Sequence, residues 1–238
     1  IFHRPYPGRE FTDVRQHPER LEQPWRWRKP SRIFVNSMSD LFHERIPFDF
    51  IDRVFAVMIG ADWHTYQILT KRPQRMLDYF GERAWEAPTG HIWLGVSVED
   101  QGTADERIPL LLQIPAAVRF VSYEPALGPV NFGLMGTAPK RWGYGYVAIY
   151  ALLNWIIAGG ESGPHARPAN PDWFRSARDE CKAAGVPFFF KQWGEWASLS
   201  EVAGGGAHHY FPDGAGVRRV GVKAAGCKLD GIIHQEYP

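Results

Sequence analysis

Six short apolar segments, each followed at once by a few polar side chains, constrain the fold of this chain more than any other feature. They are residues 33–35, 66–69, 92–96, 118–121, 155–158 and 187–190. Apolar runs of about four to six residues without alternation are typical of strands covered on both faces. Stretches with helical spacing separate most of these runs, which predicts an α/β fold with parallel strands and crossover helices.

Four helices are expected between the strands. The first spans about 50–60 and stops at Gly60, the second runs from Pro73 to Gly81, and the last begins at Asn170-Pro171 and ends at Gly185. The helix between them, over 101–113, is expected to be short or kinked because Pro109 lies inside it.

The composition is that of a globular protein and does not favour a membrane-spanning protein or one strongly steered to nucleic acid. The 238 residues are 45% hydrophobic, which suits one α/β domain of barrel size. A net charge of +1 provides no global field toward nucleic acid or membrane, and no apolar stretch reaches the roughly 18 residues that span a bilayer. Two cysteines, Cys181 and Cys227, make no disulfide framework and indicate a reducing cytoplasm; Cys181 is expected in the core.

The chain divides into three predicted parts. These are an irregular basic and aromatic segment (1–32), the strand–helix region (33–196) and a Gly-rich flap with a C-terminal tail (197–238). Residues 128–154 form an irregular insertion between strands. Residues 24–29 interleave tryptophan with arginine and lysine, as nucleic-acid surfaces do. The blander interpretation, which we favour, is that Trp25 and Trp27 pack on the domain while the cations stay solvated.

Three carboxylates, Glu99, Glu124 and Glu161, each close a predicted strand. In parallel α/β folds ligands bind at the carboxyl ends of the strands. Three carboxylates on one rim suit acid/base chemistry or an ammonium ligand. The alternative is an ion network with Lys71, Arg72 and Lys191.

Other polar residues follow the remaining strands. Lys71 and Lys191 suit a carboxylate or phosphate ligand or an amine nucleophile, with a plain salt bridge equally open. The loop after the first strand can hydrogen-bond a ribose or an amino-acid group, or simply cap the next element, through Asn36, Ser37, Ser39 and Asp40.

The run Gly159-Gly160-Glu161-Ser162-Gly163 has two interpretations. Its glycines suit a phosphate cradle of free amide groups, or a tight structural turn. No metal-binding motif is present, and His208-His209 is expected to be a solvated loop.

Longer blocks of sequence are similar to a known family. They are Arg26-Trp27-Arg28-Lys29-Pro30, Ile33-Phe34-Val35-Asn36-Ser37-Met38-Ser39-Asp40-Leu41-Phe42-His43, Leu69-Thr70-Lys71-Arg72-Pro73, Trp93-Leu94-Gly95-Val96-Ser97-Val98-Glu99, Gly159-Gly160-Glu161-Ser162-Gly163-Pro164 and Phe188-Phe189-Phe190-Lys191-Gln192-Trp193-Gly194. Over about residues 10–196, and again at Leu229-Asp230-Gly231, the chain resembles the phage and bacterial three-Cys-motif family, which is regarded as radical S-adenosylmethionine-like.

The resemblance implies a partial (β/α) TIM-type barrel and a radical S-adenosylmethionine chemistry. It implies a [4Fe–4S] cluster on three cysteines near the N-terminus, with S-adenosylmethionine on the fourth iron position. That cysteine segment is expected to be missing from this chain, which starts at Ile1, and Cys181 and Cys227 cannot replace it. These residues alone are therefore expected to bind no cluster and to be inactive in radical chemistry.

The resemblance also gives roles to strand-end residues. It places Ser97, Glu99 and Glu124 at the ribose or the substrate. Together with the strand-end positions, this makes Glu99, Glu124 and Lys191 the expected catalytic residues. Cofactor-binding roles fall to Asn36, Ser37, Asp40, Lys71, Ser97, Gly159, Gly160 and Glu161. Of these, Lys71 would hold the cofactor's carboxylate, and Gly159-Gly160-Glu161 resembles an element that holds its amino group, although here it comes late in the chain.

The leading hypothesis is a cytoplasmic radical S-adenosylmethionine-type enzyme from a phage or a prophage-bearing bacterium. Its substrate is unknown, and a nucleobase or nucleic acid suits the segment around residues 25–32. Two alternatives stay open: a non-radical barrel lyase or hydrolase that uses the strand-end Glu and Lys directly, and a nucleic-acid-binding accessory protein.

Overall fold

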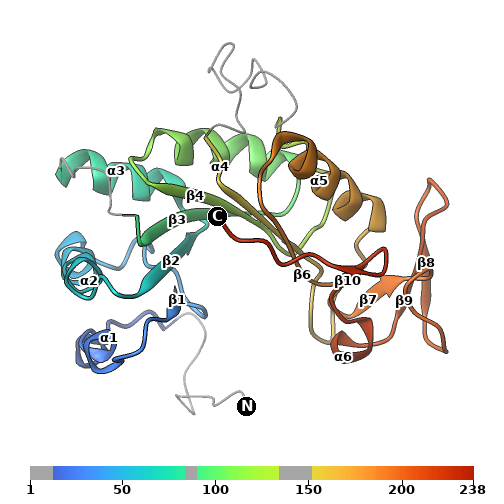
Figure 1. Cartoon of the computed structure of the whole chain (residues 1–238), viewed down its shortest axis with the longest axis horizontal. Coiled ribbons are helices and arrows are strands. Elements are labelled where there is room, and N and C mark those ends of the chain that lie inside the picture. The colour runs from blue at the N-terminus through green and yellow to red at the C-terminus, as the bar shows by residue number, and fades with distance from the viewer. Residues whose placement is uncertain (1–12, 84–89, 134–151) are drawn as a thin grey trace.

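The computed structural model describes residues 13–83, 90–133 and 152–238. Six parallel strands, in the order of the sequence, form one sheet that curls into a half-barrel. Figure 1 shows this arch, with α3, α4 and α5 along its outer side. All six apolar segments form strands as predicted: β1 (Arg32–Val35), β2 (Thr65–Thr70), β3 (Ile92–Val98), β4 (Val118–Tyr123), β5 (Trp155–Gly159) and β6 (Phe188–Gln192).

The four predicted helices are also present: α2 (Phe48–Gly60), α3 (Pro73–Arg83), α4 (Gln101–Gln113) and α5 (Pro171–Ala184). One of their details was wrong in the prediction: helix α3 passes through Gly81 instead of ending there, because an exposed glycine in a helix costs only about 1 kcal/mol. Helix α4 is not short, and Pro109 lies inside its 13 residues, since a capping box of Asp100 and Thr103 starts it and buried apolar residues hold it on the sheet.

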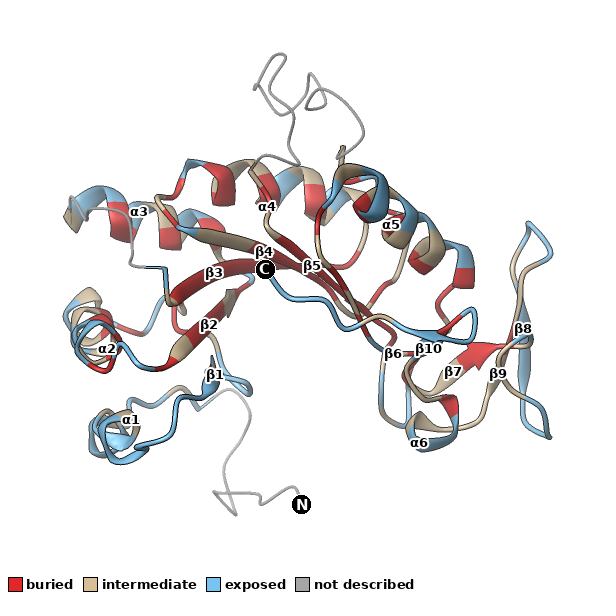
Figure 2. Cartoon of the chain, in the orientation of Figure 1, coloured by how far each residue is buried: buried red, intermediate tan, exposed pale blue. Residues whose placement is uncertain are grey.

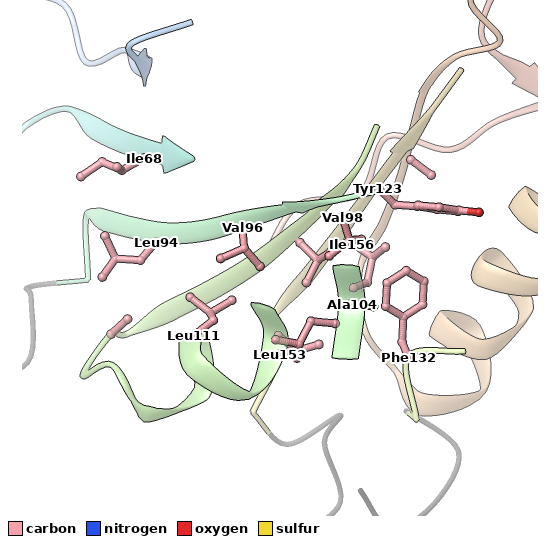
Figure 3. Packing of buried hydrophobic residues seen from close by; sticks show 14 of the residues in the cluster. Ile68, Leu94, Val96, Val98, Ala104, Leu111, Tyr123, Phe132, Leu153 and Ile156 are labelled. Carbon is pink, nitrogen blue, oxygen red and sulfur yellow. The ribbon is translucent and has the colours of Figure 1, made fainter. Parts of the chain in front are cut away.

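The two faces of the sheet carry different side chains. On the outer face Leu94, Val96 and Val98 of β3 pack toward Leu111 and Ala104 of α4 (Figure 3). The intervening residues of the strands point to the inner face, where a second buried cluster comprises Trp93, Phe120, Trp155 and Ile157. Burial on both faces is therefore confirmed for the central strands, as Figure 2 shows.

The edge strand β1 differs from its prediction. Ile33 and Val35 pack against the outer core, but Arg32 and Phe34 are exposed on the inner side. The reason is topological: β1 has a neighbour on one edge only, and no helix or strand of the described chain packs on its inner side, where Tyr237 of the tail contacts Arg32.

The first and last predicted parts contain small elements. The segment before β1, expected to be irregular, has two short helices where it is described, η1 (Pro18–Arg20) and α1 (Gln23–Arg26). Within the predicted insertion, residues 134–151 lie outside the described residues. The C-terminal part forms two small antiparallel sheets and one short helix: β7 (Trp196–Ser198), β8 (His208–Tyr210), β9 (Gly216–Arg219), α6 (Val222–Ala225), β10 (Lys228–Leu229) and β11 (Ile232–Ile233).

The last residues of the chain cross the base of the half-barrel. Phe190 N donates to His234 O at 2.9 Å, so the tail pairs with the free edge of β6. The Tyr237 ring then lies 5.1 Å from that of Trp155 and 3.7 Å below the Arg32 guanidinium of β1. The tail thus links the two edges of the open sheet. None of the described helices is long and apolar enough to cross a membrane.

Asp230 fastens this tail to α5. It accepts hydrogen bonds from Arg175 Nε at 2.8 Å and Arg178 Nη1 at 2.5 Å. Burial raises the pKa of Asp230, but the hydrogen bonds from Arg178 and Arg175 outweigh burial, so the pKa lies below its usual value of 3.8. Such a group stabilises the fold above its normal pKa and loses that effect as the pH falls through its folded pKa.

We therefore expect Asp230→Asn to lower the free energy of unfolding by about 1 kcal/mol at pH 7, because the pair is partly exposed. Asparagine tolerates the backbone φ of 53° at this position, so the change removes only the charge. Thermal unfolding followed by circular dichroism checks this at pH 7 and at pH values below 4. The gap between variant and parent should shrink with acid; a gap that stays constant contradicts the ion-pair explanation.

Candidate functional site

The predicted site residues come together at the carboxyl ends of the strands. Lys71 follows β2, Glu99 follows β3 and Glu124 follows β4, while Lys191 lies near the end of β6. Ser97 of β3 and Ser122 of β4 are partners in the parallel register, which places Glu99 beside Glu124. One rim thus carries two neighbouring carboxylates with a lysine on either side.

Glu99 is the most enclosed carboxylate of the rim. Its side chain is 11% exposed, and Lys71 Nζ donates to its Oε1 at 2.5 Å. Arg107, which reaches over from α4, donates to Glu99 Oε2 at 3.0 Å and to the Ser97 carbonyl at 2.8 Å. Two cations therefore hold one carboxylate, and they fix the end of β3 against α4.

A second ion pair joins the ends of β4 and β6. Lys191 Nζ donates to Glu124 Oε2 at 2.9 Å, and Gln192 Nε2 donates to Glu124 Oε1 at 3.3 Å. The same amide donates to Ser162 Oγ at 3.1 Å. Two neighbouring residues of β6 therefore hold Glu124, and one of them, Gln192, also contacts the loop after β5, while the Lys191 side chain remains half exposed.

The third carboxylate, Glu161, binds Arg167 through both oxygens at 2.7 and 2.8 Å. The hydrogen bonds from Arg167 lower the pKa of Glu161, so it is ionised at neutral pH and suits a base or a cation ligand better than an acid. Of the cations named for the alternative ion network, Lys71 pairs with Glu99 and Lys191 pairs with Glu124. Arg72 contacts Asp40 and Glu44 instead, and Glu161 binds Arg167, which was not predicted from the sequence to be part of the network.

The loop after β1 is hydrogen-bonded to the rest of the chain at Asp40 and exposed to solvent at its beginning. Asp40 accepts from Thr70 Oγ1 at 2.8 Å, from Lys71 N at 3.1 Å and from Arg72 Nη1 at 3.0 Å. These contacts tie the loop to the end of β2. Asn36 and Ser37, in contrast, are exposed, and the Asn36 backbone has a φ of 61°.

The geometry of the Gly-Gly-Glu run favours the tight turn over the phosphate cradle. A Cβ atom on Gly160 would lie 1.9 Å from the Trp193 carbonyl oxygen, so the two backbones touch. Gly160 N donates to Gln192 O at 2.9 Å, and Gly163 N donates to Glu195 Oε1 at 3.2 Å. These two amides are already used within the chain.

Three polar side chains lie on the inner face of the sheet below the rim. Two of them were not assigned to the site from the sequence. Gln67, Ser97 and Ser122 are only 8%, 4% and 5% exposed. Within the described part of the chain their side chains make no hydrogen bond. Ser97 was predicted, but Gln67 and Ser122 were not. The signal was available, because Ser97 and Ser122 each lie two positions before a strand-end glutamate, and alternate residues share a face.

Comparison with known proteins gives the family. From residue 4 to residue 238, the sequence matches the family described as Protein of unknown function (DUF5131). The chain belongs to this family. No curated protein and no solved structure matches it. Membership in DUF5131 does not itself assign radical chemistry, which therefore stays a proposal.

The described residues of this DUF5131 chain include no group of three or more His, Cys, Asp or Glu that could hold a metal ion. Cys181 is fully buried in the core, as predicted, and burial raises the pKa of its thiol. Cys227 lies in the loop between α6 and β10. His208 and His209 form the exposed strand β8, where Arg218 donates to His208 at 2.9 Å.

Proposed function

We propose that this chain is the barrel part of a radical S-adenosylmethionine-type enzyme, and that the inner face of the half-barrel binds the nucleoside of that cofactor. The observation that carries the proposal is the pair of neighbouring serines, Ser97 and Ser122, on the inner face: both residues are nearly enclosed, at 4% and 5% exposed. Within the described part of the chain their hydroxyls make no hydrogen bond to protein, so they are available to a ligand. A ligand with hydroxyl or ring-nitrogen groups, such as a nucleoside, can pair with them, and each such hydrogen bond contributes about 1 kcal/mol.

The surroundings of the two serines suit such a ligand. Deeper on the same face the Phe120 ring lies over Gly95, where a Cβ atom would be 2.6 Å from the ring. The glycine therefore makes room for an apolar floor. Toward the rim stand the Lys71–Glu99 and Glu124–Lys191 pairs. An apolar floor, two hydroxyls and charges of both signs match a nucleoside that carries an amino-acid group.

Within this proposal each rim residue binds a different part of the cofactor or the substrate. Lys71 binds the carboxylate of the cofactor, with Asn36 and Ser37 beside it on the loop after β1. The Glu124–Lys191 ion pair, on the same rim, faces the substrate. Glu161 stays ionised through Arg167 and attracts an amino group.

The iron–sulfur part of the chemistry does not fit the residues at hand. A cluster of this type needs three thiolates close together. The sequence has two cysteines, one of which is sealed in the core behind the sheet. A bound cluster would supply the electron that cleaves the cofactor. We assign to these residues only the binding and orientation of cofactor and substrate.

Isothermal titration calorimetry with S-adenosylmethionine tests the proposal. We expect saturable binding that weakens about 10- to 30-fold in Ser97→Ala/Ser122→Ala, because two hydrogen bonds of about 1 kcal/mol each are lost. Ser122→Leu should abolish binding by filling the site. Ser176→Ala is the matched control, since Ser176 lies exposed on α5. Absent binding, or equal affinity in the double variant and the control, overturns the proposal and favours the lyase or hydrolase alternative.

A further inference from the structure

An exposed group of aromatic and basic residues lies beside α1, at the opposite end of β1 from the rim. We call it the aromatic–basic surface; it comprises Trp25, Arg26, Trp27, Arg28, Lys29 and Trp63. Its three tryptophans are 46%, 45% and 37% exposed, for Trp25, Trp27 and Trp63 in turn. The rings of Trp25 and Trp63 meet edge to face at a centroid distance of 5.5 Å.

The tryptophans are fixed from behind. The Trp25 ring lies on Gly60, where a Cβ atom would be 2.5 Å from it. Trp63 Nε1 donates to the Trp27 carbonyl at 2.9 Å. Buried His64 accepts a hydrogen bond from Ser31 N at 3.1 Å and so anchors the same segment. The packing predicted from the sequence is present, yet each indole keeps an open area held in a set position.

The cations around these rings are available to a ligand. Among the described residues, the side chains of Arg28 and Lys29 make no ion pair or hydrogen bond. Arg26 makes only an exposed contact with Glu22 at 3.6 Å. Glu22 and Asp62 are the carboxylates close by in the sequence, so cations exceed anions here although the whole chain is nearly neutral.

The surface continues along the edge strand toward the rim. Arg32 and Phe34 are exposed on the inner side of β1, and Asn36 and Met38 follow them, also exposed. A chain-like ligand bound at the tryptophans can therefore follow β1 over about 13 Å to the carboxyl ends of the strands.

We infer that the aromatic–basic surface docks single-stranded nucleic acid. Exposed indoles stack on unpaired bases, and neighbouring cations bind the phosphates between them. A double helix hides the faces of its bases, so the same rings have less to bind there. The inference that nucleic acid docks here depends only on this surface. The further step, that the bound nucleic acid is the substrate and reaches the rim along β1, rests on the proposed function.

Fluorescence anisotropy of a labelled 20-nucleotide oligodeoxythymidine tests the docking, over about 50 to 200 mM salt. We expect binding whose affinity falls with salt. Arg28→Ala/Lys29→Ala should flatten the plot of log affinity against log salt by about 1.4, the share of two phosphate contacts. Trp27→Ala should weaken binding about tenfold. The controls are Lys228→Ala and Tyr210→Ala, which remove an exposed cation and an exposed ring elsewhere.

Circular dichroism checks that each variant is folded. The Arg28/Lys29 variant is expected to stay folded because, among the described residues, these two side chains make no ion pair or hydrogen bond. No binding at 50 mM salt, or an unchanged salt slope in that variant, overturns the inference. So does binding to anionic lipid vesicles without binding to the oligonucleotide. The Ser97/Ser122 variant should bind the oligonucleotide normally, which separates failure of docking from failure of the proposed cofactor site.

Discussion

Gly160→Ala is expected to destabilise the protein by about 3 kcal/mol or more, one of the largest effects of any single methyl group in this chain. The added Cβ atom would lie 1.9 Å from the Trp193 carbonyl oxygen, a backbone atom that cannot rotate away. The loop after β5 and the loop after β6 must then separate, and overpacking of this kind costs about 1–3 kcal/mol or more. In a chain of this length the melting temperature should fall by roughly 6–12 °C.

Gly81→Ala is the matched control for that change. Nothing lies within 4 Å of its Cβ position, and it sits inside α3, so alanine should stabilise the protein by about 0.5–1 kcal/mol. Urea unfolding followed by tryptophan fluorescence measures both. If Gly160→Ala unfolds at the same urea concentration as the parent, the backbone contact is wrong, and the glycine is free to serve a ligand instead.

The fold was largely predictable because each buried parallel strand corresponds to an uninterrupted apolar run in the sequence. A strand covered on both faces must be apolar at every position, as β3 and β5 are, and such runs stand out without an alignment. β1 produced the same trace but is half exposed. A sequence run cannot show that a strand lies at the edge of a sheet whose inner side is open, because that depends on how many strands follow and where they close.

The site was predictable in position but not in its contacts. Strand ends follow from the strands, so Glu99, Glu124 and Lys191 could be placed on one rim. The partners Arg107 and Arg167 come from a helix and a loop, and their reach depends on distances that exist only after folding. The missed hydroxyl of Ser122 depends on the pleat of β4, which assigns Tyr123 to the outer core and its two neighbours to the inner face.

The ion pairs at the rim raise the question of whether they serve the fold or a reaction, and burial gives part of the answer. Glu99 and its partner Arg107 are both mostly enclosed, at 11% and 14% exposed side chain, whereas Lys71 and Lys191 are more than half exposed. A buried pair is weak evidence for net stability, yet removing one member is costly because the other keeps its charge out of water.

We therefore expect Glu99→Gln to lower the free energy of unfolding by about 3 kcal/mol, since it leaves the Arg107 guanidinium uncompensated. Arg107 keeps the neutral Ser97 carbonyl as an acceptor, but its Nε is a buried donor without a partner within the described chain, and no carboxylate replaces Glu99 as its hydrogen-bond partner. Glu124→Gln is the matched control: it makes the same chemical change on the neighbouring strand, but frees a lysine that returns to water, so about 1 kcal/mol or less is expected. Urea unfolding of both variants measures the difference.

Glu99→Gln combined with Arg107→Met should recover most of the loss, because no unpaired charge then remains. Equal losses in the two single variants, or no recovery in the double variant, would show that the burial of Arg107 is not what makes Glu99 matter to the fold.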